Sequence, residues 1–103
     1  MKLSILMPVY NEQRYLPEAL KQALAVDYGC DVELVVVDDG SSDATPEILR
    51  STDDPRVRVI RHERNAGKGA AIRTAATAAD GDYMVILDAD LEYDPQDLSL
   101  IHI

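Results

Sequence analysis

The alternation of two hydrophobic periods along the chain constrains its fold more than any other feature. Short runs of aliphatic and β-branched residues alternate with segments whose apolar residues recur three or four positions apart. The first pattern is typical of buried strands, and the second of helices packed on a sheet. Strands are expected at 2–9, 32–37, 57–60 and 83–87. Helices are expected from about 14–16 to Val26, in a short segment capped by Thr45, over 68–79, and again after Pro95.

Strands that alternate with helices of this length predict crossover connections and therefore a mostly parallel sheet. The expected fold class is α/β. The 103 residues fit one domain, and no repeat or linker divides them. In open sheets of this kind, ligands bind beyond the carboxyl ends of the strands. The residues that follow each strand are therefore the candidates for function.

Composition excludes several classes of protein. A single cysteine, Cys30, cannot form an internal disulfide, so a disulfide-stapled secreted scaffold is excluded. No apolar run approaches the ~18 residues of a membrane span, and the N-terminus lacks a signal-peptide pattern. The net charge of −9 disfavours nucleic-acid binding, because the phosphate backbone would be repelled. We expect a cytoplasmic protein, free or at the cytoplasmic face of the membrane.

Carboxylates are concentrated in the last part of the sequence. Residues 74–103 contain seven Asp and Glu and no Lys or Arg. Asp88 and Asp90 follow the fourth strand, and residues two positions apart in an extended chain point the same way. Two converging carboxylates repel each other unless a cation lies between them, so the pair predicts a Mg²⁺ or Mn²⁺ site, to which Glu92 could add a ligand. The alternative is an acidic turn.

Groups suited to a nucleotide follow the first two strands. After the first strand, Tyr10 offers a flat face for a base, and Glu12 offers an acceptor. After the second, the acidic segment 38–43 places Asp39 where it can accept a hydrogen bond from a base N–H or a ribose hydroxyl. The competing interpretation, a turn and helix cap, is adopted for 41–43 but not for Asp39. For Glu12, a first-turn residue favoured by the helix dipole remains the alternative.

The segment Gly67-Lys68-Gly69 opens the third helix without matching a known phosphate loop. The spacing of glycines fits neither the Walker pattern nor the dinucleotide-binding fingerprint. What remains is a helix N-terminus with Lys68, which can hold an anionic group, or a flexible turn with a solvated lysine. His62, His102 and Cys30 stand alone in the sequence and are interpreted as structural or surface residues.

Four segments in this order resemble glycosyltransferase family 2, the inverting nucleotide-sugar transferases of the GT-A fold. These segments are 8–12, 37–43, 65–70 and 88–90, and the sequence 88–95 looks most like the polyprenyl-phosphate sugar transferases. The resemblance implies a UDP- or GDP-sugar donor, and an acceptor that is expected to be a lipid phosphate at the membrane surface. It implies nucleotide-pocket roles for Pro8, Tyr10, Glu12, Val37 and Asp39, contacts of Asp88 and Ala89 with the ribose and sugar phosphate, and a metal held by the catalytic Asp90.

In this family the catalytic domain continues well past the Asp-x-Asp motif, whereas the present sequence ends 13 residues after Asp90. Residues 1–103 are therefore expected to be the donor-nucleotide-binding, Rossmann-like N-terminal portion of a GT-A domain. The missing part would leave a sheet edge exposed, which predicts self-association. A receiver-like signalling domain and a non-catalytic nucleotide-binding fragment are the alternatives.

Overall fold

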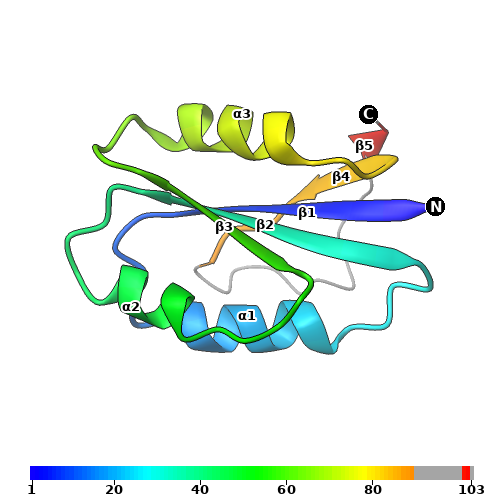
Figure 1. The fold of residues 1–103 in the computed structure, drawn as a ribbon, viewed down its shortest axis with the longest axis horizontal. Helices are drawn as coiled ribbons and strands as arrows, with labels where there is room; N and C mark the ends of the chain where they lie inside the picture. Colours follow the sequence, from blue (N-terminus) through cyan, green and yellow to red (C-terminus); the bar gives the residue numbers. More distant parts are fainter. Residues whose placement is uncertain (90–100, 103) are drawn as a thin grey trace.

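The computed structural model describes residues 1–89 and 101–102, which form one sheet with helices on both faces (Figure 1). In chain order the elements are β1 (Lys2–Val9), α1 (Leu16–Ala25), β2 (Asp31–Asp39), α2 (Thr45–Arg50), β3 (Val57–His62), α3 (Lys68–Ala78), β4 (Tyr83–Ile86) and β5 (Ile101–His102). The strand order is β3-β2-β1-β4-β5. Strands β1 to β4 are parallel, and β5 is antiparallel to β4. The expected α/β class with a mostly parallel sheet is confirmed.

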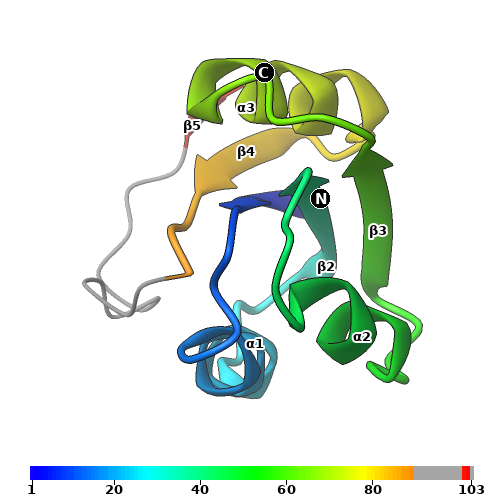
Figure 2. The ribbon, with the colours of Figure 1, turned by 90° about the vertical axis from the view of Figure 1, so that its left-hand side faces the viewer.

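Alternate side chains of the central strands enter two different cores. Helices α1 and α2 cover one face of the sheet, and α3 covers the other (Figures 1 and 2). On β2, Leu34 and Val36 pack toward α1 and α2, whereas Val35 and Val37 pack under α3. Both faces of β2 are buried, which explains why its sequence is a nearly continuous β-branched run.

The chain changes direction in the sheet after β3. It first builds outward from β1 to β2 and β3, with α1 and α2 on one face. It then crosses the other face through α3 and adds β4 on the opposite side of β1. The carboxyl ends of β1 and β4 thus lie at a topological switch point, where chain connections diverge and leave room for a ligand. Figure 2 looks toward this edge of the sheet.

Several predicted boundaries are corrected by the structure. β3 extends to His62, and α3 ends at Ala78. The predicted capping role of Thr45 is wrong, because its hydroxyl accepts a hydrogen bond from the distant Glu12 N–H at 3.0 Å. Strand β5 was not expected, and the helix predicted after Pro95 lies outside the described residues. No helix in the described part of the chain has the length and apolar character needed to cross a membrane.

Candidate functional site

A cavity of about 440 Å³ lies at the carboxyl edge of the sheet. It is lined by Pro8, Val9, Tyr10, Glu12, Asp39, Asn65, Gly67, Lys68, Ala71, Asp88 and Ala89. These residues come from the ends of β1, β2 and β4 and from the start of α3, so the cavity occupies the switch point. A larger hollow of about 640 Å³ lies beside the amino ends of β1 and β2, but no predicted site residue lines it.

Strand periodicity explains why three of these residues meet on the α3 face. Leu6 on β1 packs under α3, and so does Val37 on β2. Pro8 and Asp39 lie two positions further along these strands, so their side chains leave the same face just beyond the core. Asp88 bears the same relation to Ile86, which packs against that core at the end of β4.

Asp39 is a buried carboxylate with three hydrogen-bond donors. Its Oδ1 accepts from the Ala66 N–H at 2.9 Å and lies 2.7 Å from His62 Nδ1, and its Oδ2 accepts from the Gly67 N–H at 2.9 Å. Burial alone would raise the pKa of Asp39. The hydrogen bonds from His62, Ala66 and Gly67 outweigh burial and bring the pKa of this carboxyl below its ordinary value. Asp39 is therefore an anionic acceptor in the cavity wall.

A second charged pair lies in the same wall. The Lys68 ammonium is 2.7 Å from Asp88 Oδ1, and the side chains of these residues are 60% and 20% exposed, respectively. Lys68 is the first residue of α3, whereas Asp88 follows β4, so the pair joins two segments that are distant in sequence. The carboxylate at Asp88 thus already accommodates a positive charge at the edge of the cavity.

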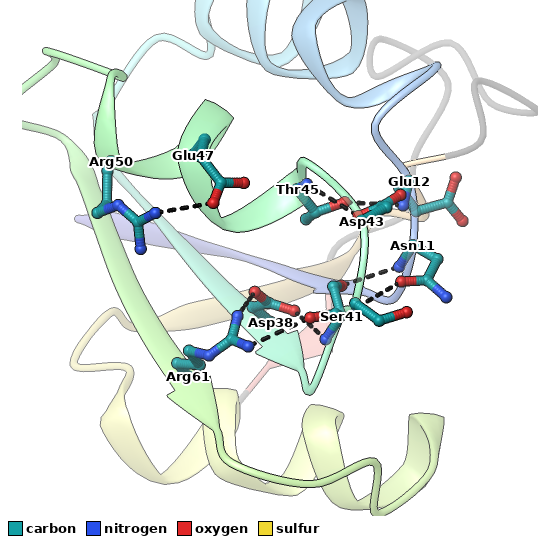
Figure 3. Close-up of polar contacts among 10 residues, drawn as sticks. Asn11, Glu12, Asp38, Ser41, Asp43, Thr45, Glu47, Arg50 and Arg61 are labelled. Atoms are coloured by element: carbon teal, nitrogen blue, oxygen red, sulfur yellow. Dashed lines mark hydrogen bonds and ion pairs between the residues drawn. The ribbon is translucent and has the colours of Figure 1, made fainter.

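Two loops at this edge hold each other in place (Figure 3). The Asn11 N–H donates to Ser41 Oγ at 2.8 Å, and Asn11 Oδ1 accepts from the Ser42 N–H at 2.8 Å. The Ser41 N–H donates to Asp38 Oδ1, and Arg61 on β3 binds Asp38 Oδ2 at 2.6 Å. These contacts support the turn interpretation of 41–43, and they fix the backbone after Tyr10 and on either side of Asp39.

The structure brings seven predicted site residues to one cavity. They are Pro8, Tyr10, Glu12, Asp39, Lys68, Asp88 and Ala89. Val37 is not among them, because its side chain is fully buried under α3. Asp90 and Glu92 lie outside the described residues. Within the described ranges, no group of three or more His, Cys, Asp or Glu side chains is placed to hold a metal ion.

Sequence reasoning missed two residues of this site. Asn65 lines the cavity, and His62 bonds Asp39 on one side and Thr74 on the other. In the sequence His62 stands alone and is interpreted as a structural or surface residue. The signal that could have found it is the register of β2 and β3, in which Asp39 pairs with His62. Parallel neighbours in register place their side chains on the same face of the sheet.

Similarity to curated proteins covers nearly the whole chain. The chain is 41% identical over 101 residues to the undecaprenyl-phosphate 4-deoxy-4-formamido-L-arabinose transferase of Edwardsiella ictaluri. This alignment covers 93% of the present chain and 31% of that protein. The chain is 41% identical over 102 residues to the transferase of the same name from Pseudomonas fluorescens, covering 93% and 30%. The chain thus spans about a third of the length of these relatives.

Solved structures show the same arrangement. The mannosyltransferase PcManGT of Pyrobaculum calidifontis, in complex with GDP-Man and Mn²⁺, superposes with a TM-score of 0.79 at 34% identity, over 85% of this chain and 27% of that one. Residues 1–349 of TarS from S. aureus, in complex with UDP-GlcNAc, superpose with a TM-score of 0.78 at 32% identity, over 87% and 27%. Both neighbours are GT-A transferases, which confirms the expected fold.

The sequence model of the family described as "Glycosyl transferase family 2" matches residues 4–101. The match includes every residue that lines the cavity. The chain belongs to glycosyltransferase family 2.

Proposed function

We propose that this chain is the donor-binding part of an inverting enzyme that transfers a sugar from a UDP- or GDP-sugar to a polyprenyl phosphate. The observation that carries the proposal is the cavity at the switch point, whose wall contains the anionic acceptor Asp39 and the Lys68–Asp88 pair. The family membership leaves the receiver-like alternative without support. In a receiver domain the acidic pair follows the first strand, whereas here it ends β2.

The nucleoside is assigned to the part of the cavity formed by Tyr10, Glu12 and Asp39. Tyr10 is 46% exposed, so its ring is accessible for stacking on a base. Asp39 can accept a hydrogen bond from a base or ribose, and Pro8 adds apolar wall beside it. The two bonded loops keep these groups in position before a ligand arrives, which reduces the ordering cost of binding.

The diphosphate is assigned to the part formed by Lys68, Asp88 and Ala89. Asp88 supplies a carboxylate oxygen, the ligand type that Mg²⁺ and Mn²⁺ prefer, and its contact with an ammonium is consistent with a cation at this place. Asp90 and Glu92 would complete the metal site, with Asp90 as the catalytic residue. When bound, the metal would stabilise the negative charge that develops on the leaving nucleoside diphosphate. The Mn²⁺ in the complex of PcManGT supports this assignment.

A lipid-phosphate acceptor is supported by the names of the curated relatives, which act on undecaprenyl phosphate. A phosphate acceptor is already anionic, so it would attack the anomeric carbon without the general base that an alcohol needs. Transfer would then take place at the cytoplasmic face of a membrane. Self-association through a sheet edge also stays a prediction. It is supported by the edge strand β3, where the apolar residue Val59 is 43% exposed.

Calorimetric titration with UDP and with GDP, each with and without Mn²⁺, tests the donor site. We expect binding that requires Mn²⁺ and weakens about tenfold or more in Asp88→Asn, because a charged ligand to the metal is lost. Asp53→Asn, which removes the same charge at an exposed position before β3, is the matched control and should bind like the wild type. Binding of neither nucleotide, or equal binding in Asp88→Asn, would contradict the proposal.

Transfer itself is measured with undecaprenyl phosphate in lipid vesicles and a radiolabelled nucleotide sugar. Radiolabel in the lipid fraction supports the enzymatic proposal. Metal-dependent nucleotide binding without any transfer would instead favour the alternative of a nucleotide-binding fragment that lacks catalysis.

A further inference from the structure

We infer that His62 and Thr74 are positioning residues of the donor site, which orient the Asp39 carboxylate so that one oxygen is left to accept a hydrogen bond from the ligand. The inference rests on the proposed function, because it assumes that Asp39 contacts the nucleotide. It adds two residues that neither line the cavity nor belong to the four segments that resemble the family. Their contribution would pass through Asp39.

The hydrogen bonds of Asp39 define which acceptor position remains. An ionised carboxylate has about four acceptor positions, two on each oxygen. Oδ1 has two partners, the Ala66 N–H at 2.9 Å and His62 Nδ1 at 2.7 Å. Oδ2 has one partner in the described structure, the Gly67 N–H at 2.9 Å. The remaining position is therefore on Oδ2, in a side chain that lines the cavity.

His62 is held at both ring nitrogens. Because Asp39 is an acceptor, Nδ1 carries the proton and donates it to Oδ1. Nε2 lies 2.8 Å from the hydroxyl of Thr74 on α3, and a hydroxyl can donate to or accept from that nitrogen. The imidazole thus has a fixed orientation and a fixed tautomer in its neutral form. Rotation of the Asp39 carboxylate would break the bond to His62 as well as the two backbone bonds.

The place of His62 in the fold suits a positioning role. It is the last residue of β3, two positions beyond Ile60, and its side chain is about 19% exposed. Its two hydrogen bonds join Thr74 on α3 to the cavity residue Asp39. A side chain whose partners are Asp39 and Thr74 is suited to hold the site in register with α3.

Two amide substitutions test the contributions of the two ring nitrogens of His62 separately. Asn has its amide group where His has Nδ1, so His62→Asn can still donate to Asp39. Gln has its amide group where His has Nε2, so His62→Gln can reach Thr74 but loses the bond to Asp39. Thr74→Val keeps the shape of the side chain and removes the hydroxyl. The three variants are compared with the wild type in the same 103-residue chain.

The dissociation constants for UDP and GDP in the presence of Mn²⁺ are the first measurement. We expect binding to weaken about tenfold in His62→Gln, because a hydrogen bond to a charged group is lost, and by less than about threefold in His62→Asn. Thr74→Val should give an intermediate loss. The pKa of Asp39, followed by carbon-13 NMR of its carboxyl group, is the second measurement. It should rise in His62→Gln and stay near the wild-type value in His62→Asn, a pattern that general destabilisation would not produce.

Failure of this inference can be distinguished from failure of the proposed function. If the wild type binds neither nucleotide, the proposed function fails and the inference fails with it. If the wild type binds and His62→Gln binds equally well, only the inference is overturned. Equal losses in His62→Asn and His62→Gln would also overturn it. If both His62 variants fail to fold, unchanged nucleotide binding and unchanged Asp39 pKa in Thr74→Val overturn it, and a loss of binding supports it.

Discussion

Glu33 and Asp39 are two buried carboxylates on the same face of β2, one near each end of α3. Asp39 accepts the N–H groups of Ala66 and Gly67, just before the helix begins. Glu33 accepts the N–H of Asp80, just after the helix ends, at 2.7 Å. The intervening residues of this face are buried under the helix. The same strand thus fastens both ends of α3 through backbone N–H donors.

The two ends differ in what surrounds the carboxylate. Glu33 Oε2 also accepts the Ser4 hydroxyl at 2.6 Å, and the Gly81 N–H donates to that hydroxyl at 2.9 Å. The Lys2 ammonium lies 3.9 Å from Glu33 Oε1, so neighbouring polar groups surround the carboxylate at the amino end of β2. Asp39 instead faces the cavity. The comparison indicates that both carboxylates anchor α3, and that of the two only Asp39 lines the cavity, where we propose its binding role.

The largest expected effects come from two glycines, one near each end of α3, at which neighbouring segments of the chain come too close for a Cβ atom. A Cβ on Gly40 would lie 2.6 Å from the Asn65 nitrogen, and its φ of +78° is unfavourable for other residues. A Cβ on Gly81 would lie 2.5 Å from Ser4 Oγ, without a positive φ. We expect Gly40→Ala to lower the free energy of unfolding by about 3 kcal/mol and Gly81→Ala by about 2 kcal/mol, measured by urea denaturation. Gly40→Ala alone should weaken nucleotide binding, because it displaces the loop beside the cavity.

The next effect tests the two carboxylates directly with matched amides. Asp39→Asn and Glu33→Gln each replace an acceptor oxygen by a donor that faces N–H or O–H groups. Each should lower the free energy of unfolding by about 1–3 kcal/mol. In calorimetry, UDP or GDP binding should fall about tenfold or more in Asp39→Asn and stay unchanged in Glu33→Gln. Loss of binding in both variants would show that the two ends are not functionally distinct.

A smaller effect is expected in the pH dependence of stability. The pKa of Asp39 is lowered in the folded state, so its ionised form stabilises the protein above the unfolded pKa of about 4. That contribution is lost as the pH falls from about 4 through the lower folded pKa. The difference in free energy of unfolding between wild type and Asp39→Asn should therefore shrink below pH 4 in urea titrations.

Other carboxyl groups also lose stabilising charge at low pH, since the pKa values of Asp43, Asp54 and Asp80 are lowered as well. Their contributions are common to both proteins and cancel in the difference. A difference that stays constant from pH 7 to pH 3 would contradict the assignment to Asp39.

The smallest effects on stability are expected from the lysine ammonium group near each end of α3. Lys2 pairs with Asp80 at 2.6 Å, and Lys68 pairs with Asp88 at 2.7 Å. Because exposed ion pairs contribute little, Lys2→Met and Lys68→Met should change the melting temperature only slightly. Nucleotide binding should weaken in Lys68→Met and remain unchanged in Lys2→Met. Equal binding in both variants would remove Lys68 from the proposed donor site.

Much of the site could be predicted because polar residues follow the apolar strands, and the carboxyl ends of parallel strands lie at the same edge of the sheet. Asp39 and Asp88 were found from this position alone, and the structure places both in one cavity. Val37 was assigned to the pocket through family resemblance, but strand periodicity directs its side chain under α3. His62 was missed because its role depends on pairing with a strand that lies 23 residues away in sequence.

The local sequence determined the order and type of the main elements and the polar character of their ends, because each period of apolar residues encodes which side of one element is buried. The tertiary structure decided the strand order, the register that pairs Asp39 with His62, and the contact of Thr45 with Glu12. These features join segments that are distant along the chain. They arise only when the two helical layers pack on the sheet, because a lone strand does not specify its neighbour.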